Sequence, residues 1–124
     1  MAMGERAAAI EMTLRVARGR AAQQATIDAW LADRRDRGDE RAPAIVAEGA
    51  FFDLRVPPDV ALVRLAAGCP CCAAQLPLRV ALMRLVRGAR ARNLLLLIAD
   101  AAHAERLRAL AANGALGVHF GEVR

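Results

Sequence analysis

The chain has 124 residues, of which 56% are hydrophobic and only 3% are aromatic, and its formal net charge is +5. This length predicts a single domain over residues 1–124, with a core of Leu, Val, Ile and Ala. All 18 basic residues are arginines scattered among acids, without the dense basic block and interleaved aromatics typical of nucleic-acid binding. The composition therefore disfavours nucleic acid as a partner, and no apolar run reaches the length that spans a bilayer.

The first half of the chain combines short apolar runs with one long amphipathic run. Residues 12–17 predict a strand, and residues 19–40 predict a helix because their apolar side chains recur at helical spacing. Residues 42–49 predict a second strand. Residues 51–59 predict a loop that contains two prolines, and residues 60–68 predict a third strand.

The second half of the chain continues this alternation. Residues 76–92 predict a helix with a leucine-rich face, and residues 93–100, NLLLLIAD, predict a strand that is buried on both faces. Residues 101–113 predict another helix, which we expect Gly114 to end, and residues 115–123 predict a short last strand. Strands that alternate with helices indicate a three-layer α/β domain, in which helices cover a mostly parallel sheet.

Three cysteines lie within four residues, at Cys69, Cys71 and Cys72, and the chain has no others. They follow a predicted strand and precede a predicted helix, which places them where open α/β sheets generally bind ligands. Clustered thiols of odd number, in a chain without an export signal, favour metal or thiol chemistry in a reducing cytoplasm over disulfides. Gly68 and Pro70 restrict the loop, so less entropy remains to be lost when it orders around a metal.

We interpret the cluster as a site for zinc or a related divalent metal. Three thiolates with an open fourth position suit metal transfer better than a permanent scaffold. Glu48, His103, His119 and water are candidates for the fourth ligand, and the spacing does not select among them. Two other interpretations stay open. The cysteines can be small buried hydrophobic residues, or a redox pair, which adjacent Cys71 and Cys72 would form only with strain.

The run VALVRLAAGCPCC, followed by a leucine-rich helix and NLLLLIAD, resembles the middle of the CobW/HypB/UreG class of metal-handling P-loop GTPases, and most of all its CobW branch. That branch carries a G-C-x-C-C motif after a strand, and residues 68–72 match it. By the same resemblance, Glu48 in APAIVAEGAFFD takes the acidic position of the family's Asn-Glu loop, with Ala47 in place of the asparagine. The resemblance covers residues 12–113 and implies a P-loop NTPase-like fold and a GTP-dependent metallochaperone or insertase associated with zinc or cobalt.

The nucleotide-binding segment departs most from the family's pattern. A P-loop needs G-x-x-x-x-G-K-[ST], whose lysine meets the β- and γ-phosphates and whose hydroxyl holds magnesium, and this chain contains no lysine. The corresponding stretch, ARGRAAQQATIDAWL, offers only partial counterparts. These are Arg18, Gly19, Arg20, Gln24 and Thr26. We therefore expect neither GTP with magnesium as a cofactor nor competent GTP hydrolysis.

The family's second acidic motif is altered as well. The later strand usually ends in glutamate, where this chain has Ala99, and we expect the neighbouring Asp100 to cap the following helix instead. The family's base-recognition segment and C-terminal domain are not among the 124 residues. The resemblance therefore implies a truncated CobW-like domain with a degenerate P-loop.

The sequence as a whole predicts a cytoplasmic protein that binds a divalent metal through three thiolates, with a client metalloprotein or a second copy of itself as partner. Two other functions stay open. One is a GTPase that uses arginine in place of the P-loop lysine, and the other is a partner-binding module whose sheet edge pairs with another chain. A remnant without a selected activity is a further alternative.

Overall fold

The computed structural model describes residues 9–49, 53–68 and 75–124, which form an α/β domain. Its strands are β1 (Glu11–Val16), β2 (Pro43–Glu48), β3 (Ala61–Leu65), β4 (Asn93–Ile98) and β5 (Glu122–Val123). Its helices are α2 (Arg20–Asp36), α3 (Leu76–Arg87) and α4 (Ala101–Ala112). All strand pairs in this described part are parallel, in the order β3-β2-β4-β1-β5, which confirms the predicted class and the parallel sheet.

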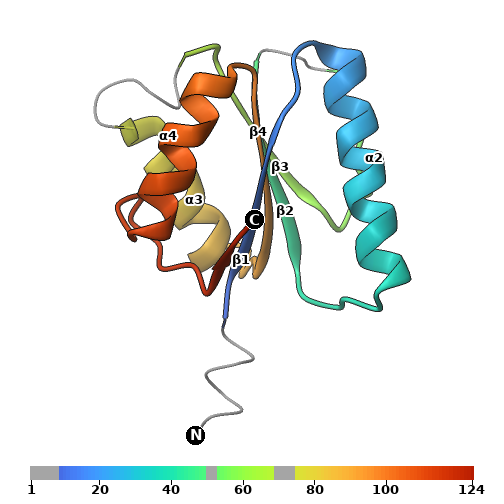
Figure 1. The fold of residues 1–124 in the computed structure, drawn as a ribbon. Helices are drawn as coiled ribbons and strands as arrows, with labels where there is room; N and C mark the ends of the chain where they lie inside the picture. Colours follow the sequence, from blue (N-terminus) through green and yellow to red (C-terminus); the bar gives the residue numbers. More distant parts are fainter. Residues whose placement is uncertain (1–8, 50–52, 69–74) are drawn as a thin grey trace, which may run out of the picture.

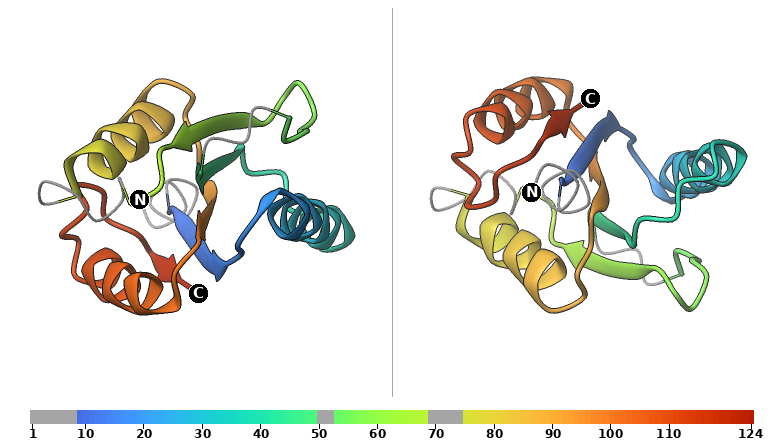
Figure 2. Two further views of the ribbon diagram at one scale, coloured as in Figure 1. Left: turned by 90° about the horizontal axis from the view of Figure 1, so that it is seen from above. Right: turned by 90° about the horizontal axis from the view of Figure 1, so that it is seen from below.

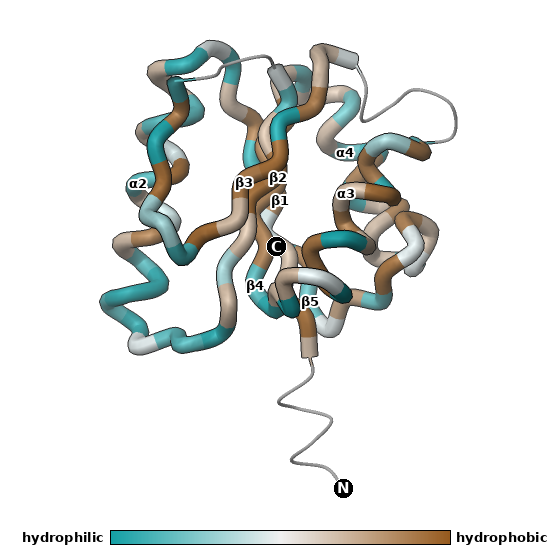
Figure 3. The backbone as a smooth tube through the Cα atoms, turned by 180° about the vertical axis from the view of Figure 1, so that it is seen from behind, coloured by the Kyte–Doolittle hydropathy of each residue, from teal (hydrophilic) through white to brown (hydrophobic). Residues whose placement is uncertain are grey.

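Helices cover both faces of the sheet (Figures 1 and 2). α2 lies against one face, and α3 and α4 lie against the other. Hydrophobic residues concentrate along the central strands, whereas α2 carries many polar residues (Figure 3). This is the three-layer arrangement that amphipathic helices and a parallel sheet produce when each buries its apolar face. Within the described ranges, no helix combines the length and the apolar character needed to cross a membrane.

β4 lies at the centre of the sheet, and all six of its residues are buried. Its even-numbered residues belong to the larger core, which they share with buried residues of α3 and α4. Leu95 and Leu97 belong to the smaller core, which they share with Ile27 and Trp30 of α2. The run of four leucines therefore reflects burial on both faces of the sheet, as the sequence predicts.

The helix predicted over residues 76–92 was too long. α3 ends at Arg87, and the Gly88 N–H donates to the Arg84 carbonyl at 2.8 Å to close its last turn. Arg90 then takes a positive φ of 56°, a left-handed conformation that a right-handed helix cannot continue through. The chain turns there and enters β4.

The predicted last strand, residues 115–123, was also too long. Only Glu122 and Val123 pair with β1. The residues before them form turns, with positive φ values of 74° at Gly114 and 85° at Gly117. Glycine adopts this conformation at little cost, so the two glycines redirect the chain where a strand would have run straight. Gly114 does follow the end of α4, as predicted.

Candidate functional site at the carboxyl edge of the sheet

The parallel strands β1 to β4 all end at one edge of the sheet, which we name the carboxyl edge, and all begin at the opposite one, the amino edge. Glu48 is the last residue of β2 and is only 5% exposed. Its Oε2 accepts a hydrogen bond from the Gly68 N–H at 2.7 Å, and its Oε1 accepts one from the Ala99 N–H at 2.8 Å. The carboxylate therefore joins β2 to the segments that follow β3 and β4.

The Glu48 carboxylate pairs with no cation in the part of the chain that the structure describes. The ion pairs of the described residues involve other acids, and Glu48 forms none of them. An ionised carboxylate offers about four lone-pair sites. The two backbone N–H groups use two, so each oxygen keeps capacity for a further donor or a metal. The residue after Gly68 is Cys69, so this buried negative charge lies at the start of the cysteine cluster.

Gln23 fills the space between the first turn of α2 and the carboxyl edge. It is fully buried, and its Nε2 donates to the Glu48 carbonyl at 2.8 Å and to the Ala17 carbonyl at 3.4 Å. Its Oε1 has no hydrogen-bond partner. The side chain thus ties the start of α2 to the ends of β1 and β2. Sequence reasoning missed this buried tether, because the Glu48 carbonyl lies 25 residues from Gln23 in the chain.

The segment expected to correspond to a P-loop begins at the carboxyl edge. Gly19 precedes α2 with φ 89° and ψ 158°, and its carbonyl accepts the Gln23 N–H at 3.0 Å. Arg18 is exposed, and the half-exposed Arg20 pairs with Asp53, with 3.2 Å between Nε and Oδ2. These residues lie together at the junction of β1 and α2, where the sequence placed them.

The other two expected counterparts are used within the fold. Gln24 holds the loop before β3, because its Oε1 accepts the Arg55 N–H at 2.7 Å and its Nε2 donates to the Arg55 carbonyl at 2.9 Å. The Thr26 hydroxyl donates to the Ala22 carbonyl within α2 at 2.8 Å. The amide and the hydroxyl that a nucleotide and its magnesium would need are therefore both already bonded to backbone groups.

Cys69, Cys71 and Cys72 lie outside the described residues, and their flanks are described. Gly68 on the near side has a positive φ of 83° and is held by Glu48. Gln75 on the far side is 9% exposed and takes a left-handed conformation, φ 61° and ψ 26°, just before α3. In the described ranges alone, no three His, Cys, Asp or Glu residues are grouped closely enough to hold a metal ion.

The structure separates the two histidines proposed as fourth ligands. His103 lies in the first turn of α4, next to the end of β4 and so at the carboxyl edge, and its Nδ1 is buried without a partner. His119 is exposed and lies two residues before Gly121, whose N–H donates to the Ile10 carbonyl at the beginning of β1. His119 therefore belongs to the amino edge, and Glu48 and His103 are the candidates on the same edge as Gly68.

Asp100 caps α4, as the sequence predicts. Its Oδ1 accepts the Ala102 N–H at 2.8 Å and the His103 N–H at 3.4 Å. The bond from the Ala102 N–H is the main reason that the pKa of Asp100 lies below its usual value, and the bond from the His103 N–H adds to this effect. The carboxylate is thus committed to the helix N-terminus, and the Ala99 N–H beside it is bound by Glu48.

The amino edge holds a polar network that sequence reasoning missed. The Asp39 carboxylate accepts hydrogen bonds from Nε and Nη2 of Arg41, at 3.0 and 2.7 Å, and from Nδ2 of Asn93 at 2.8 Å. Arg41 also bonds Glu11 at 3.1 Å, and Arg124 lies 3.6 Å from the same glutamate. The side-chain bond from Arg41 holds the pKa of Asp39 well below its usual range. The one sequence signal was a polar residue, Glu11 or Asn93, at the start of an apolar strand.

No family model matches this chain, and neither a curated protein nor a solved structure resembles it closely enough to count as a match.

Proposed function

We propose that the protein binds zinc, or a related divalent metal, through the thiolates of Cys69, Cys71 and Cys72, as a degenerate relative of the CobW-type metallochaperones. One observation carries the proposal. The buried carboxylate of Glu48, which pairs with no cation of the described residues, binds the backbone of the residue that directly precedes the three cysteines. Thiolate sulfur and carboxylate oxygen are both zinc ligands, so the donor types fit the metal.

The chain's own residues prepare such a site in two ways. Glu48 fixes Gly68 against the ends of β2 and β4, which gives the cysteine segment a defined starting point. The negative charge of Glu48 favours a cation next to it, because nothing else in the described structure neutralises that charge. The thiols must lose their protons when a metal binds, so the affinity falls as the pH is lowered. The metal is cargo here, and a client metalloprotein in the cytoplasm is the proposed recipient.

Nucleotide binding receives less support from the geometry. Gln23 is packed where the first turn of α2 meets the carboxyl edge, and Gln24 and Thr26 are bonded to backbone groups. The chain also lacks the P-loop lysine. We therefore propose metal binding, as in the family, without GTP hydrolysis.

Zinc titration of the reduced protein against a chromophoric chelator tests the proposal. We expect about one zinc per chain, bound tightly enough to protect all three thiols from a thiol reagent. The Cys69→Ser, Cys71→Ser, Cys72→Ser triple variant should lose this binding. An unchanged zinc affinity in the triple variant would falsify the thiolate site.

Two matched histidine variants test which residue is the fourth ligand. His103→Asn changes a residue at the carboxyl edge, and His119→Asn changes one at the amino edge. Glu48→Gln completes the set, because an amide keeps the shape of the side chain but removes its charge. We expect His119→Asn to leave zinc affinity unchanged and Glu48→Gln to weaken it by about tenfold or more, the usual cost of disturbing a group that ligates or orients a metal.

A further inference from the structure

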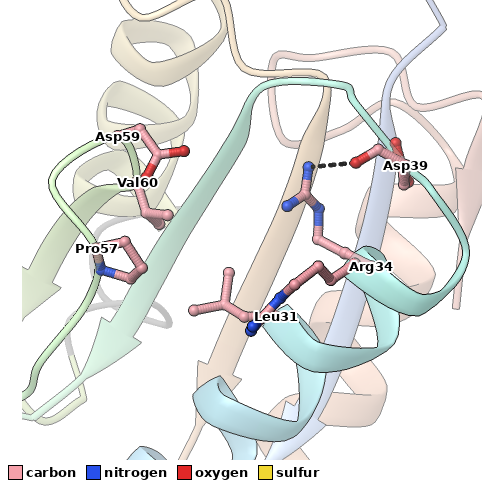
Figure 4. Close-up of a pocket in the computed structure, with 7 residues that line it drawn as sticks. Leu31, Arg34, Asp39, Pro57, Asp59 and Val60 are labelled. Carbon is pink, nitrogen blue, oxygen red and sulfur yellow. Dashed lines mark hydrogen bonds between the residues drawn. The ribbon is translucent and has the colours of Figure 1, made fainter.

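A cavity of about 360 Å³ lies beside the C-terminal half of α2, away from the carboxyl edge. One wall comes from the last turns of α2, and the other comes from the turn that leads into β3 (Figure 4). The lining residues are Leu31, Arg34, Arg35, Asp39, Pro57, Asp59 and Val60. The volume is at the small end of the range for ligand pockets, which fits a small molecule.

Arg34 is the unusual member of this lining. It is 8% exposed, yet its guanidinium bonds only neutral groups, since Nη2 donates to the carbonyl oxygens of Asp39 and Arg41. Its Nε is buried without an acceptor, and no carboxylate of the described residues lies within ion-pair distance. The face of Trp30 lies 5.4 Å away and offers partial compensation. Burial is the main reason that the pKa of Arg34 is lowered.

Asp39 and Asp59 lie near enough to offset part of the effect of burial on the pKa of Arg34, but neither carboxylate forms an ion pair with it. The Asp39 carboxylate is fully used by Arg41 and Asn93, so only the backbone oxygen of Asp39 reaches Arg34. Asp59 is exposed on the opposite wall and forms no ion pair with any described residue. Arg35, on the same wall as Arg34, likewise has no ion-pair partner among them. The α2 wall of the cavity therefore carries two guanidinium groups that form no ion pair with the described residues, because the Asp39 carboxylate beside them is bonded to Arg41 and Asn93.

We propose that this cavity binds a small organic carboxylate, whose charged group faces Arg34 and Arg35. A guanidinium binds a carboxylate through charge-assisted hydrogen bonds, which are stronger in a partly buried site than in water. The apolar body of the ligand packs against Leu31, Pro57 and Val60, which line the same space. Because Val60 precedes β3 and the cysteines follow it, this site is separate from the proposed metal site and does not depend on it.

The first experiment titrates the protein with 3-phenylpropionate and follows the backbone amide signals by NMR. We expect saturable binding in the millimolar range, with shifts around residues 31–35 and 57–60. The alcohol 3-phenylpropanol has the same apolar body without the charge. We expect the alcohol to bind at least about tenfold more weakly, because hydrogen bonds to charged groups contribute more than those to neutral groups. Equal binding of the two compounds, or no saturable binding of 3-phenylpropionate, overturns the proposal.

Four variants locate the interaction. Arg34→Gln and Arg35→Glu should each weaken the binding of 3-phenylpropionate by about fivefold or more, and Asp59→Asn should strengthen it because a like charge is removed. Arg106→Glu makes the same charge reversal on an exposed residue of α4, across the sheet, and should leave Kd unchanged. Arg35 and Asp59 are exposed, so their variants remain informative if Arg34→Gln does not fold. Unchanged Kd in Arg35→Glu, or weaker binding in Asp59→Asn, contradicts the proposal.

Discussion

At the amino edge of the sheet, Glu11 and Asp39 are paired with arginines, whereas at the carboxyl edge the described partners of the Glu48 carboxylate are two backbone N–H groups. All three carboxylates are largely buried, and burial of an unpaired charge is costly. Arg41 and Arg124 together match the charges of the two acids at the amino edge, so this network needs no further cation. At the carboxyl edge, the Glu48 carboxylate has no cationic partner among the described residues, and it binds Gly68, which directly precedes Cys69 in the sequence.

This difference separates a structural network from a candidate site within one sheet. A network whose charges are matched stabilises the fold without a cation, and its contribution depends on pH. A carboxylate bonded only to neutral donors still attracts a cation. The comparison therefore directs experiments on metal binding to the carboxyl edge and experiments on pH stability to the amino edge.

The largest expected effect is that of Glu48→Ala on stability. The substitution leaves the Gly68 and Ala99 N–H groups without their acceptor in a partly buried place, and each such loss costs about 1–3 kcal/mol. We expect the free energy of unfolding to fall by about 3 kcal/mol, measured by urea denaturation. Glu40→Ala removes an exposed acid and should change it by less than about 0.5 kcal/mol. If the two variants were equally stable, Glu48 would not join the strands.

The next effect is that of Asp39→Asn at the amino edge. Losing this charge leaves Arg41 with Glu11 as its only acid, and we expect a cost of about 2 kcal/mol at neutral pH. The side chain of Asp39 is only 9% exposed, so solvent screens the pair weakly. Urea denaturation at pH 7 measures the change. A loss as large as that of Glu48→Ala would show that the two edges differ less than their contacts imply.

The same aspartate gives the amino edge a pH dependence. The pKa of Asp39 is lower in the folded chain than the value of about 3.9 for an unfolded aspartate. Its contribution is therefore complete above the unfolded pKa and is lost as the pH falls toward the folded pKa. Between pH 7 and pH 3, the wild-type chain should lose more stability than Asp39→Asn does. Parallel losses in the two proteins would contradict this role.

The sequence predicted the fold where local pattern decides it. The alternating runs predict β1 to β4 and the helices, the leucines of β4 predict its central place, and Asp100 is identifiable as a cap. The roles of Glu48 and Gln23 depend on contacts between residues far apart in the chain. The partners of the Glu48 carboxylate lie 20 and 51 residues away, and Gln23 bonds a carbonyl 25 residues away. No periodicity or spacing encodes such contacts, because the order of strands in the sheet brings them together.

Gln24→Ala tests the hydrogen bonds that join the start of α2 to the loop before β3. Gln24 makes two hydrogen bonds to the backbone of Arg55, so its loss should cost about 1 kcal/mol, the net contribution of ordinary hydrogen bonds at a partly exposed position. Urea denaturation again measures the change. Asp28→Ala removes the remaining side-chain hydrogen bond of Gln24 without touching Arg55, and it should cost less than about 0.5 kcal/mol. If Asp28→Ala lost more stability than Gln24→Ala, the bonds from Gln24 to Arg55 would not be the contacts that stabilise this part of the fold.

The smallest effect has the opposite sign and concerns Thr26. Its hydroxyl bonds the Ala22 carbonyl within α2, a contact that adds little to a helix, and threonine is a poorer helix former than alanine. Thr26→Ala should therefore raise the free energy of unfolding by about 0.5 kcal/mol, and Ala29→Thr on the same helix should lower it by about as much. A residue that held magnesium for a nucleotide would behave differently, because its loss would abolish any increase in Tm by GTP with magnesium. If Thr26→Ala is stabilised and GTP with magnesium raises the Tm of neither the wild-type chain nor the variant, Thr26 serves the helix and not a magnesium site.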